Sequence, residues 1–297
     1  MPEQSIETHV EMLSARAGGK PWGTVIPQDG VVVGEAYGDG GSDGTKWEIG
    51  SIRKSVCSTL LGAAIAQGRV SLDTPVHEIW PDILVLGSEK DRGILVRHLA
   101  TNTSGWMLDH GPGEQWVYNN AACTAGNVVV GHVFEMADDR IAPLVEERIA
   151  GPLGLDWDCY HYEEPFRPGH AGSPGPKLAI DSTLRDLVSF GELWLNEGIL
   201  DGISVSSDYV KQARTNQCAH LEGHYGFWWF TNDGRSLIAD APGDAFYHIG
   251  HGREHRRTLF IVVPSLSLVV AIGTHEGVFD IADREKAGPV IAPLFVS

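Results

Sequence analysis

The sequence predicts an α+β fold, in which an antiparallel sheet assembled from both ends of the chain carries an inserted, mostly helical lobe. Near the N-terminus, two runs of strand-forming residues, 23–27 and 31–37, flank a Gln-Asp-Gly turn. Near the C-terminus, the runs 258–263 and 268–273 flank a Pro-Ser pair and predict a second hairpin. Because the strand signals lie at both ends and the helical signals lie between them, an alternating βαβ arrangement is not expected.

The middle of the chain has the apolar spacing of helices. After Ser51, apolar residues recur on one helical face as far as Ile65, and Gly68 is a natural helix end. We expect the helices to flank the sheet and to form a second lobe, with a functional site in the cleft between the lobes. The other segments with helical signals, the last of them interrupted by a Gly-Pro pair, are 121–137, 141–149, 184–196 and 282–294.

Composition excludes several classes of protein. The 297 residues carry a formal net charge of −17, which argues against binding to nucleic acid or to an anionic membrane surface. The first residues show no basic region followed by an apolar run, so we expect no signal peptide and a cytoplasmic location. The four cysteines form no C-x-x-C pair, and we expect no metal or other cofactor.

The first candidate for chemistry is an S-x-x-K tetrad, Ser51 to Lys54, at a predicted helix start. Residues three apart lie on the same helical face, so the lysine amine can reach the serine hydroxyl. Burial can lower the pKa of a lysine from its usual value near ~10.4 and make it a base at neutral pH. The tetrad also occurs by chance in most proteins of this length, and Ser51 could instead be only a helix N-cap.

Two further elements accompany the tetrad. Tyr118 and Asn120 form a Y-x-N pattern, in which a phenol can relay a proton and a carboxamide can bind a substrate amide. Residues 247–254 read YHIGHGRE, and a glycine-flanked strand edge lets a substrate approach main-chain N–H groups that could form an oxyanion hole with Ser51. Taken singly, Tyr118 could be a structural tyrosine and 247–254 a surface strand.

The order and spacing of these elements resemble those of the serine β-lactamase and penicillin-binding-protein superfamily. The Y-x-N element makes the chain similar to the branch of class C β-lactamases, D-alanyl-D-alanine peptidases and family VIII-like esterases. This resemblance implies one β-lactamase-like catalytic unit over 1–297, with a sheet lobe of roughly 1–50 plus 220–297 and a mostly helical lobe of 51–219. Further segments that resemble the family are VRHLATNTSG (96–105), PGEQWVYNN (112–120), GPLGL (151–155), STLRDL (182–187) and YGFWW (225–229).

The resemblance also implies roles for matching residues. Ser51 would be acylated, Lys54 and Tyr118 would share general base and acid work, and Asn120 would contact the acyl-side amide of the substrate. In the third motif a histidine replaces the lysine of the β-lactamase K-T-G, and two histidines compete for that position.

His248 fits H-x-G literally, whereas His251 fits the glycine context better, and we favour His251. Gly252 and Arg253 follow it, with an arginine where the family has a glycine. The basic cluster of Arg253, Arg256 and Arg257 could bind a substrate carboxylate, or it could be a solvated loop.

The predicted function is therefore that of a serine hydrolase which forms an acyl-enzyme with small carboxylic esters or amides. An acyltransferase on the same scaffold and a β-lactamase or D-aminopeptidase-like enzyme are the enzymatic alternatives. An inactive sensor or binding module is the non-enzymatic one. The expected partner is a small-molecule ester or amide, without nucleic acid or membrane, and the sequence does not predict an oligomeric state.

Overall fold

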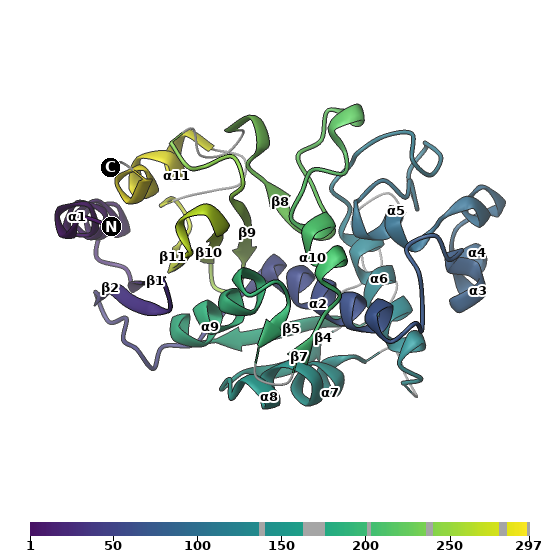
Figure 1. Cartoon of the computed structure of the whole chain (residues 1–297), viewed down its shortest axis with the longest axis horizontal. Coiled ribbons are helices and arrows are strands. Elements are labelled where there is room, and N and C mark those ends of the chain that lie inside the picture. Colours follow the sequence, from purple (N-terminus) through teal and green to yellow (C-terminus); the bar gives the residue numbers. More distant parts are fainter. Residues whose placement is uncertain (137–139, 163–175, 201–202, 236–239, 279–283, 296–297) are drawn as a thin grey trace.

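The computed structural model describes the chain apart from residues 137–139, 163–175, 201–202, 236–239, 279–283 and 296–297. Its main sheet is antiparallel and six-stranded, in the order β2-β1-β11-β10-β9-β8 (Figure 1). The sheet combines strands from the two ends of the chain, which confirms the predicted fold class. Its strands are β1 (Trp22–Gln28), β2 (Val31–Gly38), β8 (Phe230–Thr231), β9 (Phe246–His251), β10 (Arg256–Val263) and β11 (Leu268–His275).

Both predicted hairpins are present, and the pairing of β1 with β11 joins them. Val25 lies opposite Ala271 and Gln28 lies opposite Leu268 in this antiparallel register. The central strands β10 and β11 are buried along almost their whole length. A strand buried on both faces reads as a continuous apolar run, as β10 and β11 do, and it needs helices on both faces of the sheet.

Helices cover the two faces of this sheet. On one face, His9 of α1 (Glu3–Ala17) contacts the hydroxyl of Thr24 in β1. On the other face, α9 (Leu184–Leu195) packs against β1, β10 and β11, and Leu184 lies against Gly23. Because neighbouring residues of a strand face opposite ways, α1 and α9 lie on opposite faces. We did not predict α1, and α9 covers the sheet although it falls within the predicted helical lobe.

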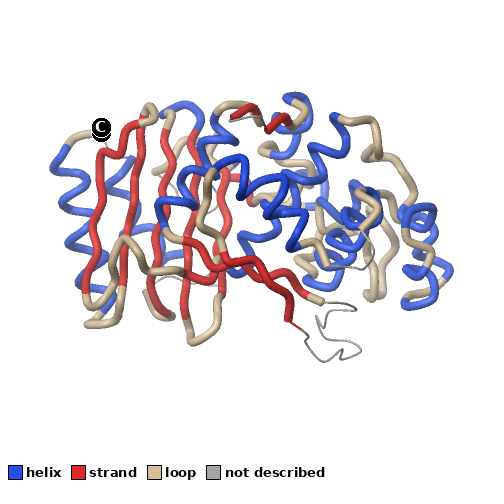
Figure 2. The backbone as a smooth tube through the Cα atoms, turned by 90° about the horizontal axis from the view of Figure 1, so that it is seen from below, coloured by secondary structure: helices blue, strands red, loops and turns tan. Residues whose placement is uncertain are grey.

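The second lobe is built around α2 (Arg53–Ala66), which packs against α6 (Asn120–Val133) and α10 (Ser207–Ala213) (Figures 1 and 2). The predicted helix 121–137 begins one residue earlier, at Asn120, and already ends at Val133; residue 137 lies outside the described residues. The predicted helix 141–149 is α7 (Ala142–Val145) followed by a π-helical turn (Glu146–Ala150) and α8 (Gly151–Leu153). The remaining helices are α3 (Val76–Ile79), α4 (Asp82–Leu86), α5 (Val96–Ala100) and α11 (Arg284–Ile291).

A small three-stranded sheet connects the lobes and was not predicted. It has the order β3-β5-β4, with β3 (Trp47–Glu48), β4 (Asp158–Tyr162) and β5 (Lys177–Ser182). β3 also packs against β10 of the main sheet. β3 therefore leads directly to Ser51, which lies at the junction of the two lobes. A two-stranded ribbon of β6 (Ile199–Leu200) and β7 (Ile203–Ser204) completes the strands of the described residues.

Candidate active site

Ser51 lies in a 3-10 turn (Gly50–Ile52) between β3 and α2, where the turn contacts the end of β9. Gly50 has a φ of 51°, a left-handed conformation that favours glycine. A Cβ atom at Gly50 would lie 2.5 Å from the main-chain nitrogen of His251, which is too close for any other residue. The backbone of the serine turn and that of β9 are therefore in direct contact.

Lys54 lies in the first turn of α2 and meets Ser51 as its spacing predicts. Its Nζ is 2.8 Å from Ser51 Oγ, and only 3% of the residue is exposed. Burial lowers the pKa of Lys54 to about 7, and the positive charges of Arg53 and Lys177 act in the same direction. A substantial fraction of Lys54 is therefore a neutral amine at physiological pH, which can accept the hydroxyl proton of Ser51.

Tyr118 lies close to both Lys54 and Ser51. Its ring centroid is 4.8 Å from Lys54 Nζ, and its hydroxyl oxygen is shielded from solvent. Burial raises the pKa of Tyr118 well above its ordinary value, and the nearby Ser51 side chain opposes this rise. The hydroxyl nevertheless forms no hydrogen bond of ordinary geometry within the described part of the chain. Tyr118 is thus a neutral phenol beside the nucleophile, placed to give or relay a proton.

The two asparagines after Tyr118 have different surroundings. Asn119 is the N-cap of α6: its Oδ1 accepts from Ala121 N at 2.9 Å, and its Nδ2 donates to Trp106 O at 2.8 Å. Asn120 begins the helix, and its buried Oδ1 has no hydrogen-bond partner among the residues described. Asn119 is therefore structural, whereas Asn120 retains an acceptor for a substrate amide.

The structure places His248, not the favoured His251, beside the reactive groups. His248 is fully buried in β9, and its ring centroid lies 6.3 Å from that of Tyr118. Its Nδ1 is 3.2 Å from Ile249 O, while its Nε2 has no partner in the described structure. Burial, with the nearby charge of Lys54, holds the pKa of His248 well below its ordinary value, so the imidazole is neutral.

His251 brings its main chain to the site. His251 follows His248 by three residues in the strand, so its side chain lies on the opposite face from that of His248. The His251 side chain is exposed. The N–H of Gly252 donates to Arg256 O in β10 at 3.0 Å. Because successive N–H groups of a strand alternate in direction, the N–H of His251 points away from β10, to the side where Gly50 lies. The exposed His251 side chain and the buried His248 side chain beside Tyr118 favour His248 for the third-motif position. The glycine context that favoured His251 does not show which face of the strand a residue occupies.

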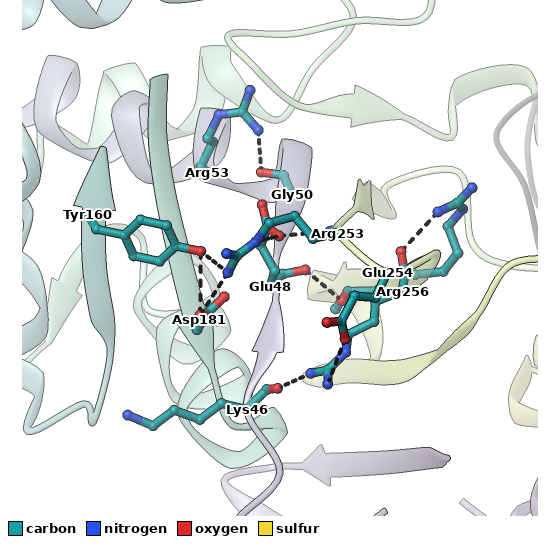
Figure 3. Close-up of polar contacts among 11 residues, drawn as sticks. Lys46, Glu48, Gly50, Arg53, Tyr160, Asp181, Arg253, Glu254 and Arg256 are labelled. Carbon is teal, nitrogen blue, oxygen red and sulfur yellow. Dashed lines mark hydrogen bonds and ion pairs between the residues drawn. The ribbon is translucent and has the colours of Figure 1, made fainter. Parts of the chain in front are cut away.

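The Arg253 side chain binds the carboxylates of Glu48 and Asp181 (Figure 3). Its main-chain N–H and its Nε donate to Glu48 Oε2 at 2.8 and 2.9 Å. Its Nη2 contacts the Tyr160 hydroxyl and lies 3.4 Å from Asp181 Oδ2. The other two arginines of the cluster also have partners, because Arg256 donates to Lys46 O at 2.7 Å and Arg257 lies 3.6 Å from Glu276. The predicted carboxylate-binding role of this cluster would require these contacts to be given up.

Aromatic side chains that sequence reasoning missed form one wall beside Tyr118. Phe230 of β8 stacks on Tyr118, with ring centroids 5.5 Å apart, and on Tyr247, at 5.4 Å. Tyr225 meets Phe230 edge-on at 4.8 Å. The signal was present in the clustered aromatics of residues 225–230, but only the fold brings them to Tyr118. This wall is apolar and accounts for much of the burial of Tyr118 and His248.

No group of three or more His, Cys, Asp or Glu side chains in the described ranges is arranged to hold a metal ion. Likewise, no helix of the described structure is both long enough and apolar enough to cross a membrane. The described residues around Ser51 offer a serine hydroxyl, an amine, a phenol, a carboxamide and an imidazole.

The family model described as Beta-lactamase matches residues 17–288. The chain belongs to the β-lactamase family. Penicillin-binding protein 4 of Amycolatopsis lactamdurans is 24% identical over 283 residues, covering 78% of this chain and 72% of that protein. This family is part of a superfamily of serine hydrolases.

Solved structures of the family show the same fold. A penicillin-binding protein homologue from Caulobacter crescentus superimposes with a TM-score of 0.74 at 17% identity, covering 98% of each chain. A D-stereospecific amidohydrolase from a Streptomyces species gives a TM-score of 0.70 at 17% identity, covering 96% of this chain and 98% of that one. At these identities the likeness establishes the architecture, and the reaction has to be argued from the residues of the site.

Proposed function

We propose that this β-lactamase family member is a serine hydrolase which forms an acyl-enzyme at Ser51 with small carboxylic esters or amides. The observation that carries this proposal is the 2.8 Å contact between Ser51 Oγ and the buried amine of Lys54, whose pKa is lowered to about 7. A serine becomes a nucleophile when an adjacent base can take its proton. The lysine supplies that base near neutral pH without a histidine–aspartate pair.

In the acylation step, neutral Lys54 accepts the Ser51 proton while Oγ attacks the substrate carbonyl carbon. The carbonyl oxygen becomes an oxyanion, which main-chain N–H groups of Ser51 and His251 stabilise. The tetrahedral intermediate then collapses, the bond to the leaving alkoxide or amine breaks, and the leaving group takes a proton relayed through Tyr118. Water then attacks the acyl-enzyme while Lys54 accepts its proton. The bond between the acyl carbon and Ser51 Oγ breaks, Oγ regains a proton from Lys54, and the carboxylic acid is released.

The third motif supports esters or simple amides over β-lactams as substrates. His248 is neutral, so the motif lacks the fixed charge of a lysine beside the reacting bond. Arg253 is already paired with Glu48 and Asp181. A charge-assisted hydrogen bond is roughly twice as strong as a neutral one. A substrate carboxylate therefore gains little binding energy from a neutral His248 and an arginine that is already paired. The named activity of the Streptomyces neighbour favours D-configured amides as the second substrate class to test.

The test is intact-mass analysis after exposure to a panel of activated esters, amides and β-lactams, with Ser51→Ala as the matched control. We expect a transient adduct of the acyl group on the wild type with esters, and none on the variant. Absence of both adduct and turnover across the panel would instead support an inactive binding module. Addition of an alcohol or amine to the ester reaction separates hydrolysis from acyl transfer, because only transfer yields the new ester or amide.

A further inference from the structure

Two main-chain segments, 48–50 and 250–253, meet next to Ser51, and glycines allow their close contact. A Cβ atom at Gly250 would lie 2.1 Å from Ile49 O, and one at Gly252 would lie 2.8 Å from Glu48 O. The segment 48–50 leads directly into Ser51, and the segment 250–253 contains His251. The spacing of these two segments therefore determines how far apart the main-chain nitrogens of Ser51 and His251 lie.

Glu48 ties these two segments together by a single carboxylate oxygen (Figure 3). Its Oε2 accepts both the main-chain N–H and the Nε–H of Arg253, and its side chain is only 7% exposed. Arg253 is two residues from His251, and Glu48 is three residues from Ser51. On its outer side the guanidinium is held by Asp181 and by Tyr160, whose ring centroid lies 5.2 Å from Arg253 Cζ.

This arrangement differs from an ordinary surface ion pair. Exposed pairs contribute little, because both side chains are mobile and solvent screens their charges. Here the carboxylate is buried, and one of its two bonds goes to the backbone, which has no rotamer freedom to lose. The contact consequently fixes a main-chain position rather than only a side-chain position.

We propose that Glu48 is a positioning residue of the oxyanion hole, which sets the separation of the Ser51 and His251 main-chain N–H groups by holding Arg253. This inference rests on the proposed acyl-enzyme function. A misplacement of about 1 Å can lower a rate by about 10²-fold. Loss of one oxyanion donor costs about 10²–10³-fold in kcat. Release of Arg253 should therefore weaken binding of the tetrahedral intermediate while leaving ground-state binding of the substrate almost unchanged.

The experiment compares Glu48→Gln, Arg253→Ala and their double variant with the wild type, and uses Arg256→Ala as the matched control. Arg256 begins β10, three residues after Arg253, and contacts Lys46 and Glu254 instead of Glu48. For each protein, kcat and KM for p-nitrophenyl butyrate are expressed per active site, titrated with a fluorophosphonate. The dissociation constant of an arylboronic acid, which forms a tetrahedral adduct with a reactive serine, is measured by calorimetry, with Ser51→Ala as the blank.

We expect Glu48→Gln to lower kcat by roughly 10–100-fold, with KM within about threefold and boronate affinity reduced in parallel. Arg253→Ala keeps the main-chain N–H bond to Glu48 and should lower kcat less. The double variant should be no worse than Glu48→Gln alone, because Arg253→Ala removes the side-chain part of the same contact. Arg256→Ala should stay within about twofold of the wild type. Unchanged per-site kcat and boronate affinity, with only a lower melting temperature or active fraction, would show a merely structural role and overturn the proposal.

Boronate binding distinguishes failure of the proposed hydrolase function from failure of the positioning role of Glu48. If the wild type turns over no ester but binds boronate, the proposed hydrolase function fails, while a weaker boronate affinity in Glu48→Gln still supports the positioning role. Equal boronate affinity in the wild type and the variants overturns the positioning role alone. If boronate does not bind the wild type at all, no functional oxyanion hole exists and both proposals are wrong.

Discussion

The side-chain amine of Lys54 lies 2.8 Å from the hydroxyl oxygen of Ser51, inside a site where the lysine is almost completely buried. A serine and a lysine at this distance on an exposed helix would be an ordinary surface pair. Burial changes the chemistry, because it penalises the charged form of the lysine and leaves a neutral amine next to a hydroxyl.

Replacement of the nucleophile should remove activity without unfolding the protein. Ser51→Ala should lower turnover by up to about 10⁶-fold, the scale reached when such a nucleophile is lost. The N-cap residue of α2 is Ile52, and no side chain caps this helix, so the alternative of Ser51 as a helix cap is wrong. Thermal unfolding of the variant should thus match the wild type. Retention of more than a tenth of the wild-type turnover would contradict the mechanism.

The rate should depend on pH through Lys54. Its pKa is about 7, and the base must be neutral to accept the serine proton, so kcat/KM should fall as the pH decreases below about 7. On the alkaline side the amine stays neutral and this limb should be flat. The measurement is a profile of kcat/KM for an aryl ester from pH 5.5 to 9, extrapolated to zero buffer. A rate that still rises without a plateau at pH 9 would mean that the pKa of Lys54 is not lowered, and a rate that is flat across the whole range would mean that Lys54 is not the base.

The same burial predicts a stability gain when the lysine is removed. The folded-state pKa of Lys54 lies below its ordinary value of 10.5, so between about pH 7 and 10.5 the unfolded chain binds more protons than the folded one. The Lys54 contribution to stability therefore rises with pH across this window, and the penalty is greatest at its lower end. Each pKa unit corresponds to about 1.4 kcal/mol.

Lys54→Met should accordingly be more stable than the wild type at pH 7, by at least about 1 kcal/mol. The difference should shrink toward pH 10. Urea unfolding at pH 7 and pH 10 checks both statements, and Lys211→Met, at an exposed surface position, serves as the control. A variant that is less stable at pH 7 would show that the lysine makes compensating contacts in the folded state.

The two histidines of the third motif should behave differently. His248→Ala removes a buried imidazole beside Tyr118 and opens a cavity in the aromatic wall, so we expect kcat/KM to fall by at least about tenfold. His251→Ala removes an exposed side chain and keeps the main-chain N–H, so it should stay within about threefold. Ester kinetics with both variants tests this directly. The reverse order of effects would restore His251 as the third-motif side chain.

These histidines illustrate what sequence could and could not predict. The S-x-x-K contact follows from helix geometry alone, and the two hairpins follow from strand signals around turns, so both could be read locally. The choice between His248 and His251 depends on which face of β9 is turned toward Tyr118. That is a tertiary property, and a shift of one residue along a strand reverses it.

The positions of Glu48 and Phe230 also could not be predicted from the sequence, because both depend on tertiary contacts. β3 has only two residues, too few for a period, and Glu48 within it meets a partner 205 residues away. Phe230 is likewise brought to Tyr118 only by the packing of β8 against β9. Asparagine is a preferred N-cap, but the helix predicted from 121 would have had Asn120 in that position, one residue after the N-cap of α6, Asn119.

The last prediction concerns β-lactams, and it depends on where Arg253 is held. A chromogenic cephalosporin carries a carboxylate next to its reactive ring, and the site offers it a neutral His248 and an arginine already paired with Glu48. We therefore expect kcat/KM for p-nitrophenyl butyrate to exceed that for the cephalosporin by at least about tenfold, the loss of roughly one charge-assisted contact. In Arg253→Ala the two values should fall by similar factors, because the arginine acts on the oxyanion hole common to both reactions. A fall confined to the cephalosporin would instead show that Arg253 leaves Glu48 to bind the carboxylate, and would make the chain a β-lactamase in which arginine replaces the missing lysine.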